Sequence, residues 1–257
     1  MGSNLHPKAV PDEAPARDEG ILHPLWAMPS VWVHGAGLSG STWDRFIGPL
    51  NKAITPDLPG HGDALQVYPA RVERFADMLK QGIPQGSVLV GHSLGGMVAL
   101  ELAARHPERV RALILIETVP TVRTSRLRVF GTSIAMKCLQ WVPPRLFVWL
   151  STLGQTEETA RHLQHQLSRH TRSSVNAALE AALHYDGVPL LSGIKVPTLV
   201  VIGQKNRATH GGARLIAQTI PGAKLVSLPG GHMLHTDNPT QLRRVIDTFL
   251  KEVFTRK

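Results

Sequence analysis

The sequence is poor in cysteine and aromatic residues, and it lacks any long apolar run. Its 257 residues include one cysteine, Cys138, so an intrachain disulfide is excluded and the cysteine pattern of a zinc site is absent. No stretch of about 18 uncharged apolar residues is present, which argues against a membrane-spanning helix. No charged start followed by an apolar segment indicates a secretory signal. We therefore expect a soluble, cytoplasmic protein.

Acidic residues are also scarce, since 28 lysines and arginines stand against 19 aspartates and glutamates, a net charge of +9. The excess is concentrated in residues 121–175, where Glu157 and Glu158 are the only acidic residues. Such a segment could serve nucleic acid, an anionic surface or an acidic ligand. Aromatic residues make up only 5% of the chain, and no nucleic-acid motif with base-stacking side chains accompanies the charge. We expect no nucleic-acid partner and interpret the segment as a solvated basic face.

Short runs rich in Val, Ile and Leu alternate with helix-like stretches over most of the chain. The runs begin at residues 30, 52, 87, 111, 197 and 223, and turn residues end each of them. Helical spacing of apolar residues lies between them, as in residues 72–81 and 96–106. Continuous apolar strands separated by helices predict an α/β fold with a mostly parallel sheet covered on both faces.

The alternation breaks once, between Glu117 and Pro197, where the apolar spacing is helical and no strand pattern is present. We predict that residues 119–189 form a helical cap inserted into a sheet core made of residues 25–118 and 190–257. Residues 1–24 contain several prolines among charged residues and no apolar period, so we expect a flexible leader there.

The stretch VGHSLGG, residues 90–96, places Ser93 directly after an apolar run. It fits the pattern G-x-S-x-G, in which a serine occupies a strained corner between a strand and a helix and small neighbours let the two elements approach closely. A serine at this place could also simply cap the helix. The five residues alone leave both interpretations open.

Residues 31–254 resemble the α/β-hydrolase superfamily in four motifs that follow one another in the expected order. They are VHGAG at 33–37, DLPGHG at 57–62, GHSLG at 91–95 and a late GH at 231–232 followed by DNP at 237–239. The resemblance implies that Ser93 is a nucleophile, that His232 is its general base, and that the backbone amides of Ala36 and Leu94 bind the oxyanion. His34 and His92 are expected to be structural neighbours of the site. No metal or organic cofactor is implied.

The third member of the triad is where the sequence departs from the resemblance. Most family members have an aspartate after the strand that follows the cap, and this chain has Asn206 there. Asparagine can hydrogen-bond an imidazole but carries no charge. We therefore assign the acid to Glu117, at the end of the preceding apolar run, which keeps the order serine, acid, histidine. The alternative is that Glu117 forms a salt bridge with a cap arginine such as Arg123.

Four further residues lie beside motif positions and are candidates for the substrate pocket, namely Leu38, Trp43, Met97 and His235. The sequence thus predicts a serine hydrolase that cleaves a carboxylic ester through an acyl-enzyme on Ser93, with a small-molecule ester or thioester as substrate. The alternative is a ligand-binding or weakly catalytic receptor whose triad has degraded. The oligomeric state is not indicated.

Overall fold

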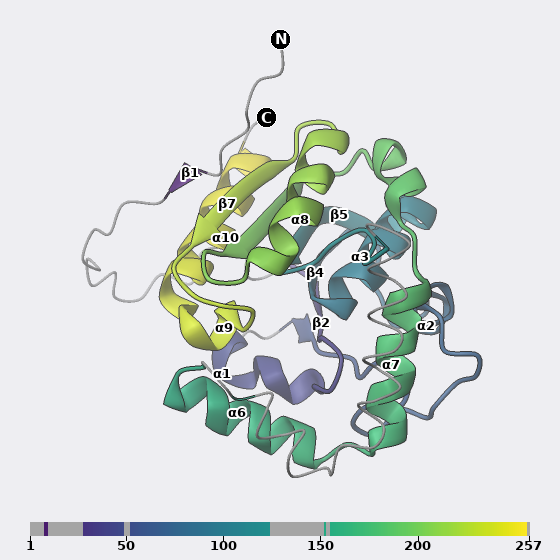
Figure 1. Cartoon of the computed structure of the whole chain (residues 1–257). Helices are drawn as coiled ribbons and strands as arrows, with labels where there is room; N and C mark the ends of the chain where they lie inside the picture. Colours follow the sequence, from purple (N-terminus) through teal and green to yellow (C-terminus); the bar gives the residue numbers. More distant parts are fainter. Residues whose placement is uncertain (1–7, 10–27, 49–51, 124–151, 153–154, 256–257) are drawn as a thin grey trace.

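The computed structural model describes residues 8–9, 28–48, 52–123, 152 and 155–255. Its sheet has seven strands, all parallel, in the order β1-β7-β6-β5-β4-β2-β3 (Figure 1). The predicted α/β fold is confirmed, because each of the six apolar runs contains one strand. The strands are β1 (Lys8–Ala9), β2 (Ser30–Val33), β3 (Ala53–Ile54), β4 (Ser87–His92), β5 (Val110–Ile116), β6 (Thr198–Gly203) and β7 (Lys224–Leu228).

Helices cover both faces of the sheet, as the unbroken apolar strands predict. One core cluster joins the sheet to α2 (Val72–Lys80), α3 (Leu94–Arg105), α7 (Arg172–His184) and α8 (Arg207–Thr219). The other joins it to α1 (Asp44–Ile47), α9 (Leu234–Asp237) and α10 (Pro239–Thr255). The described residues also form α6 (Glu157–Ser168) and 3-10 turns at η2 (Gly40–Trp43), η3 (Pro107–Arg109) and η4 (Val188–Gly193).

The register of the three central strands brings the candidate site together. His92 of β4 is paired with Ile116 of β5, and Ile116 is paired with Val201 of β6. Parallel strands end at the same edge of a sheet, so Ser93 and Glu117, each directly after its strand, lie side by side there. The residues that follow β6 reach the same edge.

The predicted helices at 72–81 and 96–106 each end one residue earlier in the structure, and two larger differences are present. α3 begins at Leu94 rather than at residue 96, because the two glycines at 95 and 96 belong to the first turn of the helix and not to the preceding turn. Lys8 and Ala9, within the predicted leader, form β1 and pair with β7, whose outer edge otherwise offers free backbone groups.

Between β5 and β6 the described part of the chain contains α6, α7 and η4, and an isolated bridge from Thr121 to Asp186 (Figure 1). Residues 124–151 and 153–154 of the predicted cap lie outside the described residues. The bounds of the cap stay a prediction. In the described ranges, no helix combines the length and apolar character that crossing a membrane requires.

Candidate active site

Ser93 lies at the corner between β4 and α3, with φ 54° and ψ −117°, a conformation that is costly for any residue except glycine. The Ser93 amide donates to Ile116 O (3.0 Å), and the Ser93 carbonyl accepts from Thr118 Oγ1 (2.7 Å). A Cβ at Gly95 would lie 2.3 Å from Val33 O, so only glycine permits this approach of α3 to β2. The Ser93 side chain makes no capping hydrogen bond to α3, which argues against the capping interpretation.

His232 is in the loop after β7, and two contacts fix its backbone. Asp237 Oδ2 accepts from the Gly231 amide at 2.7 Å, and His92 Nε2 donates to His232 O at 2.9 Å. The centroids of the His92 and His232 rings are 4.9 Å apart. Because His92 directly precedes Ser93 in the chain, these contacts bring the His232 loop to the end of β4 from which Ser93 follows. The His232 side chain is 39% exposed, so it can reach both solvent and a bound molecule.

Glu117 follows β5 with a positive φ of 51° and is 1% exposed. Its Oε1 accepts from the Gly203 amide, and its Oε2 accepts from Asn206 Nδ2 and from Thr209 Oγ1, the latter at 2.8 Å. Three donors offset much of the cost of burying a carboxylate in this position. Glu117 Oε2 is also 3.6 Å from His232 Nδ1, so the carboxylate faces the imidazole.

Asn206 stands between the carboxylate and the imidazole, with Nδ2 2.9 Å from His232 Nδ1. If His232 Nδ1 accepts a hydrogen bond from this amide, the ring proton sits on Nε2, and Nε2 cannot take a proton from Ser93. If Nδ1 carries the proton and turns it toward Glu117, Nε2 is free to accept one. The site thus contains both partners that the sequence considered. Arg123 is exposed and makes no ion pair with Glu117 within the described part of the chain.

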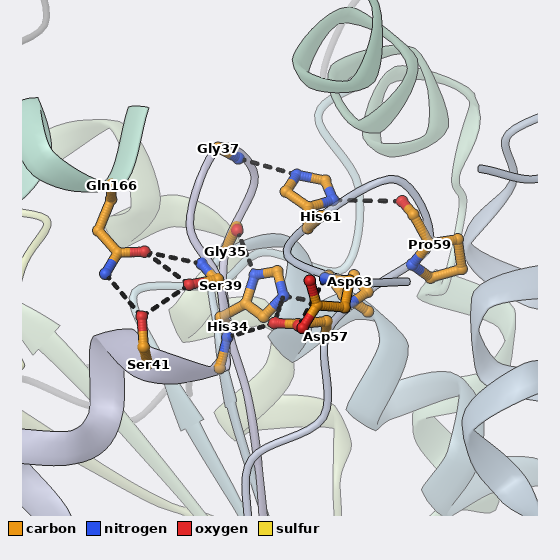
Figure 2. Close-up of polar contacts among 12 residues, drawn as sticks. His34, Gly35, Gly37, Ser39, Ser41, Asp57, Pro59, His61, Asp63 and Gln166 are labelled. Atoms are coloured by element: carbon orange, nitrogen blue, oxygen red, sulfur yellow. Dashed lines mark hydrogen bonds and ion pairs between the residues drawn. The ribbon is translucent and has the colours of Figure 1, made fainter. Parts of the chain in front are cut away.

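Residues 34–41, which we call the oxyanion loop, are held by two buried histidines (Figure 2). His34 donates from Nδ1 to Gly35 O (2.8 Å) and accepts at Nε2 from Leu58 N (2.9 Å). His61 accepts at Nε2 from Gly37 N (3.0 Å). Burial lowers the pKa of His34 to about 3 and that of His61 to about 4, so both rings are neutral and keep an accepting nitrogen at neutral pH.

The oxyanion loop lies against the Ser93 corner, since a Cβ built on Gly35 would be 3.2 Å from Ser93 Cβ. The amides predicted to bind the oxyanion, those of Ala36 and Leu94, come from this loop and from the first residue of α3. First-turn amides of a helix have no partner within the helix, and they favour negative charge. For neither amide does the described structure contain a hydrogen-bond acceptor. Both are therefore available to a ligand.

His92 and His235 are buried beside His232. Burial first and neighbouring imidazoles second hold the pKa of His92 well below its ordinary value and lower that of His235 to about 3. His235 Nε2 is 3.1 Å from Thr42 Oγ1, and its ring packs against Trp43 at a centroid distance of 4.7 Å. His235 is 3% exposed and the His232 side chain is 39% exposed, which favours His232 over His235 as the base.

Comparison with known proteins shows the family to which the chain belongs. The model of the alpha/beta hydrolase family matches residues 31–245. The chain belongs to the alpha/beta hydrolase family. It is 30% identical over 216 residues to the pimeloyl-[acyl-carrier protein] methyl ester esterase of Chromobacterium violaceum, covering 77% of this chain and 84% of the relative. It is 33% identical over 195 residues to the protein of the same name from Neisseria meningitidis, covering 69% of this chain but only 61% of the relative.

Solved structures of other alpha/beta hydrolases superpose well on this chain. MenH from S. aureus has a TM-score of 0.75 at 25% identity, covering 87% of this chain and 94% of its own. A thermophilic esterase from Thermogutta terrifontis has a TM-score of 0.74 at 26% identity, covering 88% and 90% of the two chains. These similarities support the assigned fold throughout the sheet core.

Two cavities lie near the histidines of this alpha/beta hydrolase. One, of about 370 Å³, is lined by His232 and Asn206 among others, and the second, of about 230 Å³, is lined by His235. The other predicted pocket residues, Leu38, Trp43 and Met97, are buried and line neither of these two cavities. Their assignment to a substrate pocket stays a prediction.

Sequence reasoning missed three polar residues that shape the site. Thr118 directly follows Glu117, and Thr209 is three residues after Asn206. This closeness in sequence is the only feature from which their part in the site could have been predicted. Gln166 of α6 bonds to Ser39 across 127 positions of sequence, and no local pattern indicates it. Among the residues that the structure describes, no group of three or more His, Cys, Asp or Glu side chains is arranged to hold a metal ion.

Proposed function

We propose that this alpha/beta hydrolase cleaves a carboxylic ester through an acyl-enzyme on Ser93. The observation that carries the proposal is the meeting of three groups at one edge of the sheet. Ser93 stands on a strained corner, the partly exposed His232 packs on His92, the residue that precedes Ser93, and the buried carboxylate of Glu117 is 3.6 Å from His232 Nδ1. Strain of this kind persists only where surrounding contacts impose it, and it is frequent at reactive residues.

In the first half of the reaction, Ser93 Oγ attacks the ester carbonyl carbon and gives its proton to His232 Nε2. The carbonyl oxygen becomes an oxyanion that accepts hydrogen bonds from the amides of Ala36 and Leu94, each contributing on the order of 3 kcal/mol. The tetrahedral intermediate then collapses, the bond to the alcohol oxygen breaks, and His232 gives its proton to the leaving alcohol. Glu117 stabilises the imidazolium that exists between these two transfers.

In the second half, water takes the place of the alcohol. His232 removes a proton from the water, whose oxygen attacks the acyl carbon of the Ser93 ester. Collapse of the second intermediate releases the carboxylic acid and returns the proton to Ser93 Oγ. No metal or organic cofactor takes part in these steps.

The names of the relatives suggest which ester to test first. The relatives from Chromobacterium violaceum and Neisseria meningitidis are named as methyl ester esterases that act on an acyl chain attached to a carrier protein. We propose a methyl ester of a carboxylic acid as the substrate, with a small-molecule ester sufficient for turnover. A higher kcat/KM on short acyl methyl esters than on esters of the same acids with bulky aliphatic alcohols would support this assignment. Nitrophenyl esters carry an activated leaving group and serve only as reporters of turnover.

The position of Asn206 favours a second candidate function. Asn206 Nδ2 lies 2.9 Å from His232 Nδ1, whereas Glu117 Oε2 lies 3.6 Å from the same nitrogen. The shorter contact favours the tautomer with its proton on Nε2, in which Nε2 cannot act as a base. A chain held in that tautomer would bind an ester or acid in the same site and turn it over slowly. This alternative is a ligand-binding, weakly catalytic alpha/beta hydrolase.

A nitrophenyl ester assay separates the two functions. The enzyme is expected to release nitrophenol with multiple turnovers, and Ser93→Ala is expected to abolish release. The matched control is Ser192→Ala, because Ser192 is an exposed serine of η4 and should leave the rate unchanged. If the protein binds the ester but releases nitrophenol no faster than Ser93→Ala does, the enzymatic proposal is contradicted and the second function is supported.

A further inference from the structure

The oxyanion loop is held from two directions. On the side of the sheet core, His61 accepts the Gly37 amide. On the other side the loop meets α6, a helix from the segment between β5 and β6 (Figures 1 and 2). A Cβ on Gly37, whose φ is +73°, would lie 2.7 Å from Leu167 Cδ2, so the helix packs directly on the loop.

The polar part of this contact is made by Gln166, whose side chain is buried with a residue exposure of 2%. Gln166 Oε1 accepts from both the amide and the hydroxyl of Ser39, each at 2.9 Å. Gln166 Nε2 donates to Ser41 Oγ at 3.1 Å. One amide group thus bonds to two residues of the oxyanion loop, as Figure 2 shows.

These bonds have a consequence for the predicted oxyanion hole. Leu38 N donates back to Gly35 O at 3.3 Å, so residues 35–38 form one short turn, and Ser39 directly follows its last residue. The direction of the Ala36 amide is set by the ends of this turn. His61 holds the middle of the turn at Gly37, and Gln166 holds Ser39, which follows its end.

We propose that Gln166 is a positioning residue that aims the Ala36 amide at the oxyanion. This inference rests on the proposed function, since it assigns Gln166 a part in stabilising the transition state of ester cleavage. Without the Gln166 acceptor the Ser39 amide, which is buried, has no partner, and the end of the turn shifts to find one. An amide that moves by about 1 Å stabilises an oxyanion much less, whereas the neutral ground-state ester hardly depends on it.

The test compares Gln166→Met, which keeps the length of the side chain and removes both polar atoms, with two other variants. Gln166→Glu keeps an acceptor for both Ser39 donors and serves as the conservative rescue. Gln164→Met makes the same chemical change on an exposed position of α6 and is the matched control. For each variant, kcat and KM are measured on a nitrophenyl ester, and the concentration of reactive Ser93 is measured by titration with a fluorophosphonate.

We expect Gln166→Met to lower kcat by about 10- to 100-fold with KM within about twofold of the original. Phenylboronic acid, which forms a tetrahedral adduct with a reactive serine, should bind more weakly by a similar factor. Gln166→Glu should recover most of the loss, and Gln164→Met should show none. If Gln166→Met does not fold, Gln166→Asn, which retracts the amide by one carbon, replaces it in the same measurements.

Two results would overturn the inference while leaving the proposed function intact. One is an unchanged kcat in Gln166→Met, and the other is a lowered kcat with unchanged affinity for phenylboronic acid, which would indicate a structural role only. Absence of ester hydrolysis that depends on Ser93 in the original protein would refute the proposed function and this inference together.

Discussion

Replacing Glu117 by glutamine removes a buried negative charge from the candidate triad while keeping its shape. In the structure Glu117 Oε2 is 3.6 Å from His232 Nδ1, and the carboxylate accepts from Gly203, Asn206 and Thr209. Glutamine can still accept from the Gly203 amide through its oxygen. Its side-chain nitrogen is a donor and would face the donors of Asn206 and Thr209, so these groups must reorient. Because glutamine is neutral, the imidazolium also loses its counter-charge.

The distance gives the size of the effect. Two unit charges 3.6 Å apart attract by roughly 4–5 kcal/mol at an effective dielectric constant of about 20. His232 is 39% exposed, so solvent screens part of this attraction. We therefore expect Glu117→Gln to lower kcat/KM by about 10²- to 10³-fold, since each factor of ten corresponds to about 1.4 kcal/mol.

The assay is steady-state hydrolysis of a nitrophenyl ester by Glu117→Gln and by Asn206→Ala. Asn206→Ala removes a neutral donor that competes for His232 Nδ1, and we expect a change of less than about tenfold. Circular dichroism and thermal unfolding of both variants establish that they fold. A larger loss in Asn206→Ala than in Glu117→Gln would refute the assignment of Glu117 as the acid and make Asn206 the residue that orients the base.

Two further predictions concern stability. The pKa values of His34, His61 and His235 are lowered from 6.5 to about 3, 4 and 3, so the unfolded chain binds more protons than the folded one below pH 6.5. The free energy of unfolding should fall by about 1.4 kcal/mol per pH unit for each histidine as the pH drops from 6.5 toward 4, and a urea midpoint that stays constant across this range would contradict the neutral assignment. A Cβ at Gly95 would lie 2.3 Å and 2.4 Å from backbone oxygens, whereas one at Gly211 in α8 meets nothing within 4 Å. Gly95→Ala should therefore prevent folding or cost several kcal/mol, and Gly211→Ala should stabilise the protein by about 0.5–1 kcal/mol, both measured by urea unfolding.

The sheet could be predicted from the sequence because each central strand is an unbroken apolar run that turn residues terminate. The strained corner at Ser93 could be predicted as well, since the glycines at 91 and 95 mark a place where backbone must approach backbone. Glu117 was assigned as the acid because it directly ends an apolar run and keeps the order serine, acid, histidine, and this role stays a prediction. In each case the signal lies within a few residues of the feature itself.

The contacts that complete the site could not be predicted in this way. Asn206 was expected to be able to hydrogen-bond the imidazole, but the sequence did not indicate that it would also contact Glu117, as it does in the structure. The bond from Gln166 to Ser39 depends on how α6 packs against the sheet domain. Residues so distant in sequence meet only through tertiary packing, and neither a periodic pattern nor a local motif in the sequence indicates such a contact.

The most direct test of the central claim is the mass of the protein during turnover. The chain is mixed with excess nitrophenyl acetate, quenched in acid within the first seconds and analysed by intact-mass and peptide mass spectrometry. The account predicts a mass increase of one acetyl group, located on Ser93, and no increase in Ser93→Ala. Hydrolysis that proceeds without an adduct on Ser93, or an adduct that persists in Ser93→Ala, would contradict it.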